Sequence, residues 1–125
     1  MLIKIKACAL NHLDIWVRNG LPGLSIPLPL IMGSDASGVI IECGSNIINY
    51  QIGDEVVIQP GTFNLNCPSV KNSRENYSKS YGILGETSNG VQSEIISLKP
   101  QNIHLKPKHL SFEESSSMQL VFMTA

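Results

Sequence analysis

Hydrophobic and polar residues alternate from Leu2 to Leu10, which predicts a strand with one apolar and one polar face. Further short strands are predicted where β-branched runs stop at a glycine, a proline or a turn. These runs cover residues 37–43, 55–59, 91–98 and 103–105. Turn signals at regular intervals between short strands favour a mainly β fold, either a mostly antiparallel barrel or a sandwich.

Helical patterns are scarcer than strand patterns. Residues 12–18 predict one or two helical turns that end at Asn19-Gly20, where glycine suits a C-terminal cap. Ser111 and Glu114 have the spacing of a capping box, which predicts one helix running from Ser111 to the end of the chain. Residues 62–80 are polar and rich in Asn and Ser, and they are interpreted as one long loop.

Composition narrows the class of protein. The 125 residues suit one domain, and a net charge of −1 without a basic run argues against binding nucleic acid through phosphate contacts. No apolar run reaches the roughly 18 residues that span a bilayer, and the first residues lack a signal-peptide pattern, so no membrane association is expected. The three cysteines are far apart, which favours a reducing cytoplasm over a disulfide framework. Cys8 and Cys43 are expected to be small buried hydrophobes in strands.

Several short motifs follow one another in a fixed order. Asn-His-Leu-Asp follows the first strand, Gly33 to Ile40 opens the next, and Gly-Asp-Glu-Val makes a tight turn into a third. Within the second motif, Gly33 allows a turn close to another backbone, and Gly38 allows a close approach inside a strand. In this order the motifs resemble the N-terminal, GroES-like catalytic domain of the medium-chain dehydrogenase/reductase superfamily. That superfamily includes zinc alcohol dehydrogenases and zinc-free quinone oxidoreductases.

The resemblance implies a GroES-like, partly open β-barrel with short helices. Residues 1–110 would form this domain, truncated at its start. Residues 111–125 would be the first part of a helix leading to a missing Rossmann domain. The chain contains no Gly-x-Gly-x-x-Gly fingerprint, so we expect it to bind no NAD(P) tightly by itself. NADPH or NADH is expected only in the full-length enzyme, which we expect to be a homo-oligomer.

The family's metal positions carry residues that are poor zinc ligands. The catalytic Cys-His-Cys set falls on Asn11, Ser34 and a position near Leu120. Amide, hydroxyl and alkyl groups do not replace thiolate and imidazole. The four cysteines of the structural zinc lobe fall on Asn64, Cys67, Val70 and Ser78. The resemblance therefore implies the metal-free branch, so we expect no bound zinc and expect Cys67 to be an exposed, non-ligand thiol.

Two functions remain open from the sequence. In the first, the chain is the substrate-side domain of an NAD(P)-dependent, zinc-independent alcohol dehydrogenase-like or quinone oxidoreductase-like enzyme, and it is inactive by itself. Asn11, Ser34 and Asp35 are then catalytic, with Asn11 or Ser34 donating a hydrogen bond to a developing oxyanion in place of zinc. His12 and Thr124 would contact the cofactor, and the substrate would be a small carbonyl, alcohol or quinone. In the second, the chain is a non-catalytic GroES-like remnant or binding module from a broken reading frame. Asp14 matches an acid that orients the zinc-bound His, and it also suits capping of the first helix.

Overall fold

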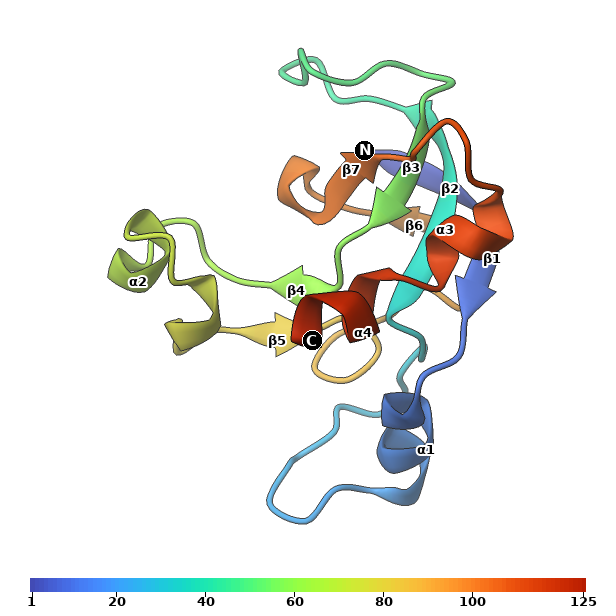
Figure 1. Cartoon of the computed structure of the whole chain (residues 1–125). Coiled ribbons are helices and arrows are strands. Elements are labelled where there is room, and N and C mark those ends of the chain that lie inside the picture. Colours follow the sequence, from blue (N-terminus) through green and yellow to red (C-terminus); the bar gives the residue numbers. More distant parts are fainter.

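The computed structural model describes all residues 1–125, and its largest unit is an open five-stranded sheet in the order β6-β1-β2-β3-β7. All its strand pairs are antiparallel. Its strands are β1 Leu2–Ala9, β2 Asp35–Glu42, β3 Glu55–Ile58, β6 Ile95–Ser97 and β7 Ile103–Leu105. A separate pair joins β4 (Gly61–Thr62) to β5 (Gly82–Ile83). The prediction of a mainly β, open architecture with short helices is confirmed (Figure 1).

The helices are all short. They are α1 His12–Asn19, α2 Pro68–Lys71, α3 Phe112–Ser116 and α4 Gln119–Thr124, with 3-10 turns η1 Glu75–Tyr77 and η2 Pro100–Asn102. The predicted first helix is confirmed, and Gly20 caps it with a φ of +83° that glycine adopts without strain. None of these helices has the length and apolar character that a membrane-crossing segment requires.

Strand β2 lies at the centre of the main sheet and contributes to its core. Nine buried apolar side chains form this core: Ile3, Ala36, Ile40, Val56, Ile58, Leu84, Val91, Leu98 and Ile103. Gly38 lies on β2 where a Cβ would collide with the backbone oxygen of Lys4 on β1. The predicted close approach at Gly38 is therefore confirmed, and it brings β1 and β2 together.

Two expectations about the strands need correction. The predicted strand over residues 91–98 is reduced to β6, because Val91 and Gln92 donate their N–H groups to Gly33 and Met32 outside any ladder. Cys8 is exposed, since it lies on the polar face of β1, and its Sγ donates to the Val91 oxygen at 3.1 Å. Cys43 is half-buried and packs against the core.

The last segment of the chain is two helices, whereas one continuous helix was predicted. The capping box at its start is confirmed, with Ser111 Oγ accepting from the Glu114 N–H at 3.1 Å. The helix ends at Ser116, and the backbone N–H of Leu120 then donates to the Asp35 carboxylate. In a continuous helix that N–H would donate to the Ser116 carbonyl four residues earlier. The Ser117 hydroxyl also donates to the Glu114 carbonyl, a side-chain bond that competes with helical order.

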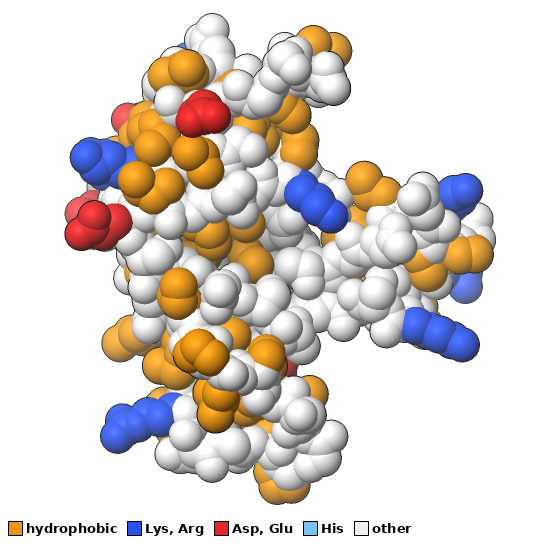
Figure 2. Space-filling model, turned by 180° about the vertical axis from the view of Figure 1, so that it is seen from behind, with side chains coloured by type: hydrophobic (Ala, Val, Ile, Leu, Met, Phe, Trp, Pro, Cys, Tyr) orange, Lys and Arg blue, Asp and Glu red, His pale blue; other side chains and the backbone are white.

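Residues 62–80 form a projection from the sheet and are not a structureless loop. The projection leaves through β4, contains α2 and η1, and returns through β5 (Figure 1). Basic side chains lie near its outer end in the rear view (Figure 2). A second projection is formed by α1 and the loop after it, where Ile15, Trp16 and Leu28 are exposed. Leu10, just before α1, is exposed as well.

Candidate functional site

The pairing of β1 with β2 brings Asn11 beside Asp35. The strands are antiparallel with Ala9 opposite Asp35, so the end of β1 adjoins the start of β2. Asn11 lies two residues beyond Ala9, and its Nδ2 donates to Asp35 Oδ2 at 3.0 Å. Two of the residues that the sequence predicted to be catalytic are thus in direct contact.

Asp35 is the buried centre of this arrangement. Its side chain is 1% exposed, and its second oxygen, Oδ1, accepts from the backbone N–H of Leu120 at 2.9 Å. Burial raises the pKa of Asp35 above its usual value, because an ionised carboxylate loses hydration there. The hydrogen bonds from Asn11 and Leu120 oppose this rise in pKa, and the nearby Asp14 carboxylate adds to it.

Asp14 fixes the start of α1. It is 7% exposed, and its Oδ2 accepts the backbone N–H of Asn11 at 2.8 Å. The predicted capping role is therefore confirmed. The bond also holds the Asn11 backbone in place, which leaves the Asn11 side chain free to reach Asp35.

Ser34 lies next to Asp35 but faces a different partner. It is 1% exposed, and its Oγ–H donates to the Leu84 carbonyl at 2.8 Å. The preceding Gly33 has a φ of +91°, and its carbonyl oxygen occupies the space that a Cβ on Gly85 or Gly90 would need. The predicted tight turn at Gly33 is confirmed. It directs the Ser34 hydroxyl inward, so the single hydroxyl proton is already used in an internal bond.

The two residues predicted to contact the cofactor are both on the surface. His12 is exposed and meets Trp16 edge to face, with ring centroids 4.9 Å apart. Thr124 is exposed near the end of α4, and its Oγ1 donates to the Leu120 carbonyl at 2.8 Å. Leu120 thus links Thr124 to Asp35 through consecutive hydrogen bonds. The predicted cofactor contacts of His12 and Thr124 stay predictions.

Zinc does not fit the residues at this site. Asn11 and Asp35 are bonded to each other, Ser34 is bonded to Leu84, and Leu120 offers an alkyl side chain. No group of three or more His, Cys, Asp or Glu side chains anywhere in the chain is arranged to hold a metal ion. Catalytic zinc sites use three such ligands.

The projection at residues 62–80 gathers three of the four positions matched to the structural zinc lobe. Asn64, Cys67 and Ser78 line the same surface depression of about 500 Å³. Cys67 was expected to be exposed, but it is half-buried. Its Sγ lies 3.4 Å from Ser69 Oγ. Hydrogen bonds from Ser69, and then from Ser78, lower the pKa of Cys67 to about 7. One thiol without further ligands does not make a closed zinc site.

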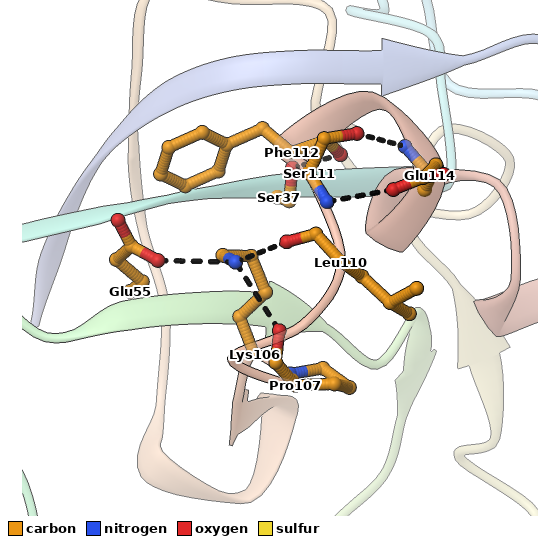
Figure 3. Close-up of polar contacts among 8 residues, drawn as sticks. All are labelled: Ser37, Glu55, Lys106, Pro107, Leu110, Ser111, Phe112 and Glu114. Carbon is orange, nitrogen blue, oxygen red and sulfur yellow. Dashed lines mark hydrogen bonds and ion pairs between the residues drawn. The ribbon is translucent and has the colours of Figure 1, made fainter.

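Lys106 has a structural role that the sequence did not predict. Its side chain is 4% exposed, and Nζ lies 3.1 Å from Glu55 Oε2 on β3 (Figure 3). Nζ also donates to the carbonyls of Pro107 and Leu110, and it lies 5.3 Å from the centre of the Phe112 ring. These bonds hold the loop that leads into α3. A lysine in a run of Lys, Pro and His residues gives no sequence signal of burial.

Comparison with known proteins identifies relatives along the whole chain. The family model of the alcohol dehydrogenase GroES-like domain matches residues 1–108. A zinc-type alcohol dehydrogenase-like protein of Schizosaccharomyces pombe is 30% identical over 125 residues, which are 100% of this chain and 34% of that protein. The 2-methylene-furan-3-one reductase of Solanum lycopersicum is 33% identical over 126 residues, which are 100% of this chain and 28% of that protein.

A solved structure extends the comparison to three dimensions. The crystal structure of an NAD-dependent alcohol dehydrogenase matches with a TM-score of 0.92 and 41% identity, covering 98% of this chain and 36% of that one. This chain therefore spans about a third of the length of the relatives it matches.

Proposed function

This chain belongs to the alcohol dehydrogenase GroES-like domain family, and on that premise we propose that it is the substrate-side domain of an NAD(P)-dependent oxidoreductase that works without zinc. The substrate class is a small carbonyl, alcohol or quinone. The relatives bear names of alcohol dehydrogenases and of a reductase, which supports redox chemistry at carbonyl or enone groups. A cytoplasmic location suits the three free thiols and is part of the same proposal.

The observation that carries this proposal is the contact between Asn11 and Asp35. An amide nitrogen has two N–H groups, and the bond to Asp35 uses one of them. The second is available to donate to a substrate oxygen. Because Asp35 is buried and Asp14 holds the Asn11 backbone, the amide is oriented before any substrate arrives. Such preorganised donors stabilise negative charge that develops on oxygen during a reaction.

The cofactor supplies or accepts the hydride when it is bound. The residues of this chain bind and orient the substrate oxygen so that charge can develop beside the Asn11 amide. Ser34 has no free hydroxyl proton while it donates to Leu84, so Asn11 is the donor we propose. Three depressions of about 400 to 500 Å³, near Leu84, Cys67 and Phe63, are lined by other residues. We propose that the remaining walls of a substrate site at Asn11 come from the rest of the enzyme.

A fusion enzyme tests the proposal. Residues 1–125 would replace the matching segment of the 41% identical NAD-dependent alcohol dehydrogenase, leaving the rest of that enzyme to bind the cofactor. We expect NAD(P)H-dependent reduction of small carbonyls or enones in the presence of a chelator. Asn11→Ala should lower kcat by about a hundredfold, as loss of one preorganised donor does.

Asn19→Ala is the matched control, because Asn19 is an exposed amide at the other end of α1. It should leave kcat unchanged. A folded fusion that binds cofactor but reduces no carbonyl, enone or quinone would favour the alternative, a non-catalytic GroES-like module. Activity that needs added zinc would contradict the zinc-free part of the proposal.

A further inference from the structure

Helix α4 is attached to the rest of the molecule at one polar point. None of its residues is buried, and its other side-chain hydrogen bonds, from Gln119 and Thr124, stay within four residues along the chain. The bond from the Leu120 N–H to Asp35 Oδ1 spans 85 residues. It is the single long-range hydrogen bond that α4 makes.

The same bond falls where the helix is interrupted. A continuous helix would use the Leu120 N–H to reach the Ser116 carbonyl. That N–H points to Asp35 instead, and α3 and α4 are separated at Ser117 and Met118. The chain changes direction there (Figure 1). Helix α3 lies against β1 and β2, and α4 contacts β2.

We propose that Asp35 is a positioning residue that takes the Leu120 N–H out of the helical ladder and thereby sets the direction of α4. This inference rests on the proposed function, because α4 carries Thr124, the residue predicted to face the cofactor. Asp35 can do this because its two carboxylate oxygens accept hydrogen bonds from different partners. Oδ2 is held by Asn11 at the start of α1, and this orients Oδ1 toward Leu120.

The Asp35 carboxylate also connects Asn11, the proposed oxyanion donor, to α4. Asn11, Asp35 and Leu120 belong to three segments that are far apart in sequence and share one carboxylate. A change in the direction of α4 would therefore act on the carboxylate that orients the Asn11 amide. The carboxylate couples the substrate side of the domain to the segment that leads toward the cofactor.

Solution NMR of the 125-residue chain tests this directly. Asp35→Ala removes the acceptor, and we expect the Cα shifts of Ser117 and Met118 to move to helical values as α3 and α4 join. Residual dipolar couplings of the α4 amides should then report a new direction relative to β2. Asp35→Leu repeats the test with the side-chain volume kept, in case the alanine variant fails to fold.

Two further variants separate positioning from general stabilisation. Asp35→Asn keeps an oxygen acceptor, and the Asn11 amide can turn to present its own oxygen to the new NH₂ group, so the break and the direction of α4 should be restored. Ser37→Ala removes a bond from the same strand to the Phe112 carbonyl in α3, now 2.6 Å long. It should lower stability without moving α4.

The inference is overturned if Asp35→Ala and Asp35→Leu keep the break at Ser117 and the direction of α4. The serine hydroxyls of α3 would then cause the break. It is also overturned if Ser37→Ala moves α4 as far as Asp35→Ala does. None of these readouts depends on cofactor or substrate, so the inference can fail while the proposed function stands, and the reverse also holds.

Discussion

Asn11 Nδ2 and Asp35 Oδ2 lie 3.0 Å apart, joining the segment after β1 to the first residue of β2. The bond places an amide donor beside a carboxylate that is 1% exposed. It follows from the register of the two strands, in which Ala9 is opposite Asp35. Asn11 stands at a position where the family resemblance implies a zinc ligand, and Asp35 directly follows Ser34, which stands at another. A hydrogen bond therefore occupies the site that metal coordination would otherwise organise.

The buried carboxylate should make stability depend on pH in a defined direction. Burial raises the pKa of Asp35, so the folded state binds this proton more tightly than the unfolded state does. The contribution of Asp35 to the free energy of unfolding is then largest below its unfolded pKa and falls as the pH rises through its folded pKa. Relative to Asp35→Asn, the natural chain should lose stability on going from about pH 4 to pH 7. Urea unfolding gives the free energy of unfolding of both proteins across this range. If the value for the natural chain minus the value for Asp35→Asn stays constant or rises with pH, the raised pKa of Asp35 is contradicted.

Cys67 should be the most readily alkylated of the three thiols near neutral pH. Its pKa is lowered to about 7, so about half of it is thiolate at pH 7, against about 1% for a thiol with the ordinary pKa of 9.0. Although Cys8 is exposed as a residue, its Sγ is partly desolvated where it meets Val91; this, and then the Asp14 carboxylate, raises the pKa of Cys8. Cys8 is therefore the matched control. Iodoacetamide labelling followed by mass spectrometry gives the rates against pH. Ser69→Ala should move the midpoint for Cys67 upward, and equal rates at Cys8 and Cys67 at pH 7 would refute this prediction.

The two partners of the Lys106–Glu55 ion pair should respond unequally to substitution. Lys106 is 4% exposed and also serves two carbonyls, so Lys106→Met should lower the free energy of unfolding by about 2 kcal/mol. Glu55 is 51% exposed, and Glu55→Gln should cost less than about 1 kcal/mol because water screens that end of the pair. Thermal and urea unfolding measure both changes. Equal losses in the two variants would show that the ion pair, and not the carbonyl contacts, accounts for the effect of Lys106.

The sequence predicted those features that depend on neighbouring residues. Alternation along β1, the glycine cap of α1 and the Ser111–Glu114 capping box are local patterns, and each is confirmed. Gly38 was also predicted, because a glycine inside a β-branched run indicates close backbone approach.

The features that depend on distant residues could not be predicted in this way. The break between α3 and α4 coincides with a bond to a carboxylate 85 residues earlier in the chain, which no helical periodicity reveals. The burial of Lys106 depends on Glu55 and on carbonyls presented by a folded loop. The site residues were selected by resemblance, and their contact with one another became visible only through the register of β1 and β2.

The zinc content of the purified chain tests the central claim most directly, namely that hydrogen bonds stand in place of metal at Asn11, Ser34 and Asp35. A variant with Asn11→Cys, Ser34→His and Leu120→Cys restores the ligand types that zinc prefers and serves as the positive control. Elemental emission analysis should find well under one zinc per chain in the natural protein. One zinc bound per natural chain, retained through dialysis against a chelator, would contradict the account.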